Sequence, residues 1–368
     1  MRKSVKIIVA LVVVALLIPI AAFYASPAMQ DEVFAVAARR QLMRTSQLPL
    51  TNDAIRVVLC GTSSPLPTRA SAKSCNLIAV GGRLFVVDIG PEASENLALW
   101  RIPSPRIEGV FITHFHSDHI GELGELNIQG WAQGRQVPLQ VYGPTGIASV
   151  VAGFNQAYGF DNRYRHALHN HGRGLLPLDA AAMQSNEFAL PATPDARGVQ
   201  SVVVYDRDGI RVTAIRVQHA PVEPAVGYRF DYRGRSVVFT GDTTYYRPLA
   251  IAAAGADVLI SEGQASHLQD IVASEAAVQG QATLAQILRD TRTYHITPVQ
   301  AARMANQARA RMLVFTHIAP PIVNPVVTTP WLRGVSAVRP RGVMMGHDGM
   351  VITIPLDGAA LRFDDLTG

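Results

Sequence analysis

The start of the chain has a different pattern from the rest. Cationic side chains precede a nearly unbroken apolar stretch at residues 7–25. This order is typical of a signal peptide or an uncleaved signal anchor, and the stretch is just long enough to span a bilayer. We expect residues 1–30 to be that segment and residues 31–53 to be a linker. The catalytic part should then lie on the periplasmic or extracellular side, secreted or attached to the membrane.

From residue 54 onward, short apolar runs alternate with turn-forming residues. The runs at 75–80 and 84–89 predict two strands, and Gly81-Gly82 between them predicts a hairpin. Other strands are predicted at 55–60, 109–113, 139–142, 201–205, 210–217, 226–232, 235–240, 256–261, 312–316, 343–345 and 351–354. Hairpins are followed by helices, and the order repeats in the second half. This predicts two sheets packed face to face with helices outside, rather than a doubly wound parallel sheet.

Residues 160–200 lose this periodicity and read as an insert in a domain at 54–368. Basic and imidazole side chains gather there: Arg163, Arg165, His166, His169 and His171. They could line an anion pocket, but a solvated insert is the simpler interpretation. The insert should shape either the substrate pocket or a contact in a homodimer.

Composition narrows the class of protein. The chain of 368 residues is 48% hydrophobic and 17% charged, which fits a folded globular protein and excludes a disordered chain or a many-span membrane protein. The net charge of +5 is mild, with no long basic run of the kind expected for non-specific nucleic-acid binding. Two cysteines, Cys60 and Cys75, either pair with each other or are small buried side chains.

The densest chemistry follows the predicted strand at 109–113. His114, His116, Asp118 and His119 lie within six positions. Imidazole and carboxylate are ligands preferred by zinc and similar divalent ions. The spacing can supply two adjacent metals, with His114 and His116 on one and Asp118 and His119 on the other. Solvated surface histidines are the alternative, which this clustering disfavours.

Two metals need more ligands than these four. His219, Asp242 and His317 each follow a predicted strand, where a rigid scaffold can hold a ligand in place. Each alone would be an ordinary loop residue. Together with the cluster they favour a metal site.

This set of residues resembles the metallo-β-lactamase superfamily over roughly residues 54–356. The resemblance implies an α/β fold, a four-layer αββα sandwich with a dinuclear site at one edge between the sheets. Asp242 stands where β-lactamases of this fold carry cysteine. That residue, the opening segment 61–65 and the segment 294–298 are similar to the branch of arylsulfatase-like enzymes and tRNA 3′-processing endonucleases.

The resemblance also implies roles for the residues. Metal 1 would be held by His114, His116 and His219, metal 2 by Asp118, His119 and His317, and Asp242 would bridge them. Two Zn²⁺ ions per chain are expected, with Mn²⁺ or Fe²⁺ as alternatives. Asp118 would orient the attacking water or accept its proton. His295 would donate a proton or hydrogen bond to the leaving oxygen, or else be a surface residue capping the next helix.

We therefore expect an exported dinuclear zinc hydrolase of small anionic esters, either aryl or alkyl sulfates or phosphodiesters. One alternative is a lactonase or other carboxyl-ester hydrolase on the same metal core, and another is an RNA 3′-end endonuclease. A non-catalytic metal-binding module is a further alternative. The lack of a basic arm and the export signal argue against a nucleic-acid partner.

Overall fold

The computed structural model describes residues 2–322 and 324–367 and divides at Gln47. The first unit holds the helices α1 (Arg2–Ala25) and α2 (Pro27–Met43). Ser26 caps α2, because its side chain accepts a hydrogen bond from Met29 N. No helix among the described residues combines the length and the apolar character needed to cross a membrane. The expected signal segment, linker and location outside the cytoplasm stay predictions.

The second unit contains two β-sheets, with eight and seven strands in the described part of the chain. The eight-stranded sheet runs in the order β15 (Arg362–Asp365), β14 (Met350–Pro355), β1 (Ala54–Gly61), β2 (Cys75–Val80), β3 (Arg83–Ile89), β4 (Ile107–Phe111), β5 (Gln140–Pro144) and β6 (Gln184–Phe188). The seven-stranded sheet runs β13 (Val343–Met345), β12 (Met312–Ala319), β11 (Val258–Gln264), β10 (Arg235–Phe239), β9 (Val226–Tyr232), β8 (Ile210–Arg216) and β7 (Ser201–Arg207). Both sheets mix parallel and antiparallel pairs.

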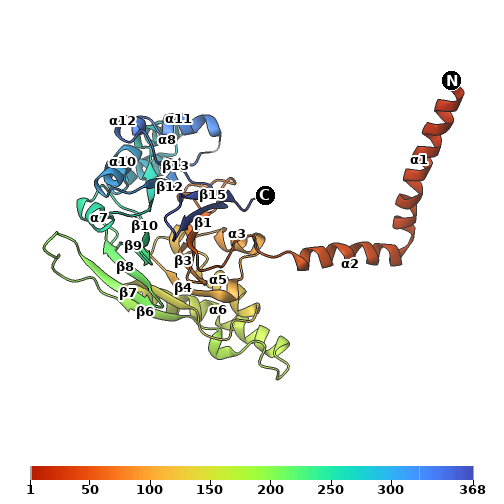
Figure 1. Ribbon diagram of the computed structural model, residues 1–368, viewed down its shortest axis with the longest axis horizontal. Coiled ribbons are helices and arrows are strands. Elements are labelled where there is room, and N and C mark those ends of the chain that lie inside the picture. The colour runs from red at the N-terminus through yellow and green to blue at the C-terminus, as the bar shows by residue number, and fades with distance from the viewer. Residues whose placement is uncertain (1, 323, 368) are drawn as a thin grey trace. The chain divides into compact units, whose positions relative to one another are not determined.

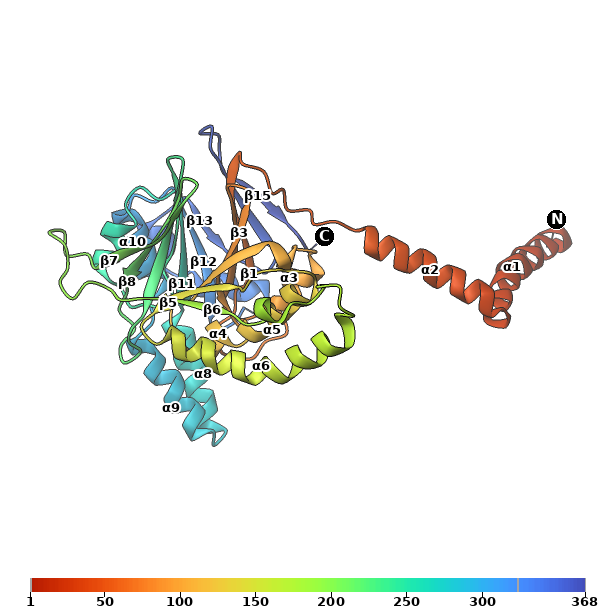
Figure 2. The same ribbon diagram turned by 90° about the horizontal axis from the view of Figure 1, so that it is seen from below.

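Helices cover the outer face of each sheet (Figures 1 and 2). The eight-stranded sheet carries α3 (Ala93–Leu99), α5 (Leu123–Ala132) and α6 (Ile147–His169). The seven-stranded sheet carries α7 (Arg247–Ala252), α8 (Ser266–Val278) and α10 (Pro298–Gln307). The remaining helices are α4 (Ser117–Ile120), α9 (Ala282–Asp290), α11 (Thr328–Trp331), α12 (Val335–Val338) and the short 3-10 turns at 104–106, 178–180, 291–293 and 325–327.

Three apolar layers hold this arrangement together. Strand β1 shows why, since Ile55, Val57 and Leu59 join the cluster between the sheets while Val58 and Cys60 face the helices. Alternate side chains of a strand point to opposite faces, so a strand buried on both sides is mostly apolar. The layers confirm the predicted αββα four-layer sandwich.

The segment at 160–200 is more ordered than its sequence pattern predicts. Helix α6 continues to His169, and β6 adds an edge strand to the eight-stranded sheet. The apolar face of α6 ends near Tyr158, because the next buried position on that side is the polar Asn162. Hydrophobic periodicity therefore stops before the helix does.

Helix α10 begins beside the candidate site and depends on its cap. Thr297 Oγ1 accepts a hydrogen bond from Gln300 N at 3.3 Å, and Gln300 Oε1 accepts one from Thr297 N at 2.9 Å. Replacing Thr297 with alanine should lower the free energy of unfolding by about 1 kcal/mol, since the backbone N–H of Gln300 at the helix start loses its acceptor. Urea unfolding measures this. Ser274→Ala, which removes only a hydroxyl bond within α8, is the control, and an equal effect would contradict the prediction.

Candidate metal centre

The cluster of three histidines and one aspartate lies in the segment from the end of β4 through α4. Its backbone is anchored on both sides, because Thr113 N donates to Asp88 Oδ1 at 2.8 Å and Thr113 O accepts from Val226 N at 3.0 Å. The side chains of His114 and His119 are buried. The loop therefore joins the two sheets at the point where it presents its imidazoles.

The other three predicted ligands come from the seven-stranded sheet. His219 follows β8 and Asp242 follows β10, as the strand pattern predicts. His317 lies inside β12 instead. The pairing of β11 with β12 skips it, since Glu262 pairs with Thr316 and Gly263 with Ile318. This bulge, in which His317 has a φ of 43°, turns the imidazole out of the regular alternation.

The structure brings all seven predicted ligand residues together in two groups. In each group the potential ligand atoms lie within 4.8 Å of one another. The first group is His114, His116, His219 and Asp242, and the second is Asp118, His119 and His317. Asp242 also lies next to the second group, because its Oδ2 is 3.5 Å from His119 Nε2 and 3.4 Å from His317 Nε2.

Neighbouring residues orient the imidazoles. His119 Nδ1 lies 2.8 Å from Asp88 Oδ2, and His219 Nδ1 lies 2.9 Å from the carbonyl oxygen of Tyr294. A histidine that binds metal through one nitrogen commonly donates its other N–H to such an oxygen. Both contacts leave Nε2 facing the centre. The sequence pattern did not identify Asp88, although it is a carboxylate at the end of a predicted strand.

The donor set fits divalent metal ions. Within the described part of the chain, His119 Nε2, His219 Nε2 and Asp242 Oδ1 are buried without a hydrogen-bond partner. Buried polar atoms are normally paired, so these three have the character of metal-ligand atoms. Imidazole nitrogen and carboxylate oxygen are ligands for Zn²⁺, and they also suit Mn²⁺ or Fe²⁺.

Burial and nearby charges shift the pKa values of the histidines in opposite directions. Burial lowers the pKa of His114 well below its usual value. Burial also opposes protonation of His119, but the charges of Asp242 and Asp118 outweigh it and raise the pKa of His119 well above its usual value. The same balance raises the pKa of His317 to about 9. Protons and metal ions therefore compete for the same nitrogens.

This competition predicts a pH dependence. Without metal, the pKa of His317 is raised from its usual 6.5 to about 9, so protonation of this histidine stabilises the fold. That stabilisation is complete below pH 6.5 and is lost as the pH rises through about 9. Zinc needs the neutral imidazole, so zinc affinity should rise over this window, by about tenfold per pH unit for each proton displaced. Unfolding temperatures with and without zinc across the window test this. A zinc-induced gain that does not change with pH would contradict it.

His295 lies beside both groups. Its side chain is 8% exposed, and its Nδ1 is 2.8 Å from Glu262 Oε2 and 3.8 Å from Asp242 Oδ2. The alternative role of capping the next helix is taken by Thr297. Its predicted part in proton transfer stays a prediction.

Glu262 is the functional candidate that the sequence reasoning missed. Besides its contact with His295, its Oε1 accepts a hydrogen bond from Thr243 N at 2.6 Å, next to Asp242. The carboxylate is 2% exposed and could also be grouped with the metal-binding residues. Its two hydrogen-bond partners suit it better to orienting His295. The available signal was a carboxylate placed directly after the predicted strand at 256–261.

The remaining histidines have other surroundings. His166 Nδ1 lies 2.6 Å from Leu176 O, and His267 Nε2 lies 2.9 Å from Pro330 O. His169, His171 and His347 are exposed or half-exposed. Arg163 stacks over the ring of Phe160 and Arg165 pairs with Asp161, so these groups form a solvated helix surface rather than an anion pocket.

Comparison with known proteins identifies relatives across most of the chain. Residues 83–318 match the family model described as a beta-lactamase superfamily domain. Ribonuclease Z of Mycobacterium sp. (strain KMS) is 33% identical over 296 residues, covering 80% of this chain and 94% of that protein. Ribonuclease Z of Mycobacterium avium (strain 104) is 35% identical over 272 residues, covering 73% and 88%.

Solved structures agree on the fold. Human tRNase Z, short form, has a TM-score of 0.57 at 22% identity and covers 82% of this chain and 99% of its own. The metallo-beta-lactamase fold protein YhfI from Bacillus subtilis has a TM-score of 0.57 at 21% identity and covers 82% and 100%.

These relatives correct the expected partner. The expectation of a small anionic ester and no nucleic acid is wrong, because the matched relatives are named as ribonucleases. The absence of a basic run from the sequence favours a substrate other than nucleic acid, but it does not exclude a nucleic-acid substrate. The 33 lysines and arginines are scattered along the chain, and folding can gather such residues on one surface without leaving a run in the sequence. The relatives likewise give no support to sulfate-ester hydrolysis or export.

The αββα sandwich and its two groups of histidine and aspartate residues occur with a family match across residues 83–318 and ribonuclease Z relatives at 33–35% identity. The chain therefore belongs to the metallo-β-lactamase superfamily of metal-dependent hydrolases, with ribonuclease Z among its relatives.

Proposed function

We propose that this chain is a dinuclear metal-dependent endonuclease that hydrolyses a phosphodiester bond near the 3′ end of an RNA. The observation that carries this proposal is the identity of 33% to a ribonuclease Z along 94% of that protein. The convergence of seven candidate ligands at one place supports it, because a relative that had lost the activity would be free to lose them.

We assign one metal ion to each group. The first is held by His114, His116 and His219, the second by Asp118, His119 and His317, and Asp242 is shared. When bound, two zinc ions would polarise the phosphoryl oxygens and activate water as the nucleophile. The position of Asp242 Oδ2, within 3.9 Å of a ring nitrogen in each group, supports its shared role.

The chain's own residues would handle the protons. Asp118 Oδ2 lies 3.1 Å from His317 Nε2, where a carboxylate can orient the attacking water and accept its proton. His295 would give a proton to the leaving ribose oxygen. Glu262 holds His295 through Nδ1, which fixes the ring and leaves Nε2 to exchange the proton with the substrate. Glu262 thus acts as a positioning residue.

The direct test is cleavage of a tRNA precursor that carries a 3′ trailer. The full chain, loaded with zinc, should release the trailer at a single position, mapped with a label at the 5′ end. The mature tRNA without a trailer and an unstructured RNA of equal length are the controls. No cleavage by a protein shown to hold two zinc ions would contradict the proposal.

A further inference from the structure

The loop that joins β1 to β2, residues 62–74 (the β1–β2 loop), is closed at its base by a disulfide. Cys60 and Cys75 flank the loop, are fully buried, and are bonded with their Cα atoms 4.9 Å apart. Of the two roles that the sequence left open for these cysteines, the structure shows the pair. Disulfides persist in oxidising compartments and are reduced in reducing ones. The covalent link at the base of the loop therefore depends on the redox conditions around the protein.

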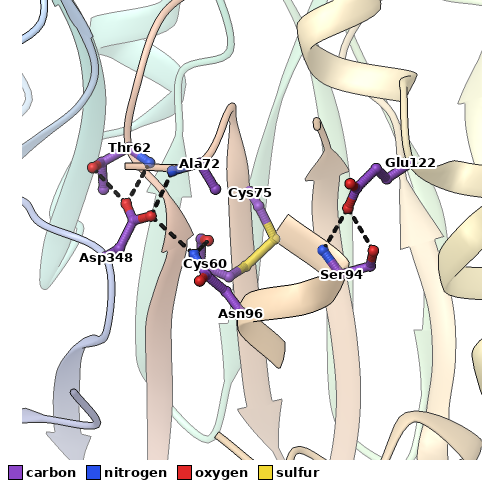
Figure 3. The surroundings of a disulfide bond; sticks show 8 residues. All are labelled: Cys60, Thr62, Ala72, Cys75, Ser94, Asn96, Glu122 and Asp348. Carbon is purple, nitrogen blue, oxygen red and sulfur yellow. Dashed lines mark hydrogen bonds between the residues drawn. A yellow bond between two sulfur atoms is a disulfide. The ribbon is translucent and has the colours of Figure 1, made fainter. Parts of the chain in front are cut away.

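Asp348, from the turn before β14, ties the same loop from inside (Figure 3). Its Oδ1 accepts hydrogen bonds from Thr62 N at 3.0 Å and Thr62 Oγ1 at 2.7 Å, and its Oδ2 accepts one from Ala72 N at 2.7 Å. Asn96 Nδ2 donates to Asp348 Oδ2 and to Cys60 O, both at 2.9 Å. One half-buried carboxylate therefore holds both ends of the loop next to the disulfide.

The first end of the β1–β2 loop supports His317. Thr62 O accepts a hydrogen bond from Ile318 N at 2.8 Å, and Ser63 forms a β-bridge with Ile318. His317 has a φ of 43°, in the left-handed region that costs energy for a residue with a Cβ. Such a conformation persists only where its neighbours hold it. The loop holds the residue immediately after it.

The other end supports the backbone of Asp118. Lys73 N donates to Pro91 O at 2.9 Å, and Gly90 N donates to Ser74 O at 3.0 Å. A Cβ placed on Gly90 would lie 2.1 Å from Asp118 O and 2.6 Å from Lys73 Cβ. Gly90 is thus packed directly between the loop and the segment that presents Asp118.

The two supported residues belong to the same metal group. Asp118 and His317 both belong to the second group, and they touch each other at 3.1 Å. The hydrogen bonds of the β1–β2 loop reach Ile318, which follows His317, and Gly90, which packs against Asp118 O. Among the described residues, none reaches a histidine of the first group (His114, His116 and His219) or a residue next to one of them in the sequence. We propose that Asp348 and the Cys60–Cys75 disulfide are a positioning device for the second metal ion alone. This inference rests on the metal centre proposed above.

The test compares stepwise zinc affinities, measured by competition with a chromophoric chelator, in the full-length protein. Asp348→Asn and the double variant Cys60→Ala/Cys75→Ala should each weaken one of the two zinc ions about 10- to 100-fold, the range for residues that orient metal ligands. The other zinc should stay within about twofold of the unchanged chain. Asp357→Asn, at an exposed turn aspartate, is the matched control and should change neither affinity.

Combined variants show which zinc is affected. Adding Asp348→Asn to His116→Ala, which disables the first group, should weaken the zinc that remains. Adding it to His317→Ala should have no further effect. Equal weakening of both ions, or a lower unfolding temperature with unchanged affinities, would overturn the proposal. If Asp348→Asn does not fold, Thr62→Val, which removes one bond to Asp348, and the cysteine pair decide the question. An unchanged chain that binds fewer than two zinc ions would instead defeat the proposed metal centre.

Discussion

Replacing Asp242 with alanine is expected to remove both metal ions and nearly all hydrolytic activity. The Asp242 carboxylate is 2% exposed, and its Oδ2 lies 3.4–3.9 Å from ring nitrogens of His114, His119, His219 and His317. Removing one member of a buried charge cluster costs about 3–5 kcal/mol. If that cost falls on metal binding, zinc affinity drops about 10²- to 10³-fold or more. Zinc per chain and the rate of RNA cleavage measure the two consequences.

Two further variants make this result specific. Asp242→Asn keeps the shape of the side chain but not its charge. Its zinc content and cleavage rate should therefore lie between those of the unchanged chain and of the alanine variant. Asp364→Ala changes an exposed aspartate on the edge strand β15 and should leave zinc content and rate unchanged. An alanine variant at 242 that still held two zinc ions would show that Asp242 is not shared between them.

The part of the site that is compact in sequence could be predicted from the sequence. His114, His116, Asp118 and His119 are neighbours, so their spacing alone reveals a set of ligands. Isolated ligands such as Asp242 were found because they follow recognisable strands. Glu262 also follows a predicted strand, but its role could not be assigned, because its partner His295 is 33 positions away and only the fold brings the two together.

The same distinction applies to the fold. Strands buried on both faces were predicted within a few residues, because most positions in them are apolar. The edge strands β6 and β15 were not predicted, since their side chains are largely exposed and need no alternation. The sequence also left the pairing of Cys60 with Cys75 open. The bulge that turns His317 inward depends on the register between β11 and β12. That register cannot be read from the sequence of either strand alone.

Replacing His295 with alanine is expected to slow RNA cleavage by about 10²- to 10⁴-fold, the usual contribution of a general acid. It should leave two zinc ions per chain, because His295 is outside the seven assigned ligands. Glu262→Gln should follow the same pattern with a smaller loss, since glutamine can still accept the hydrogen bond from Thr243 N but holds His295 less strongly. Zinc content and cleavage rate together separate these variants from those of the ligands.

The chemical role of His295 can be separated from a merely structural one by the leaving group. A ribose oxygen is a poor leaving group and needs a proton, whereas a nitrophenolate leaves without one. An acid at position 295 therefore predicts that His295→Ala loses most of its rate on RNA and little on an activated aryl phosphodiester used as a probe. Equal losses on both would mean that His295 shapes the site instead of protonating the leaving oxygen. Loss of zinc in this variant would mean that His295 is a ligand. A further group, whose potential ligand atoms also lie within 4.8 Å of one another, would then describe the second metal better: Asp242, Glu262, His295 and His317.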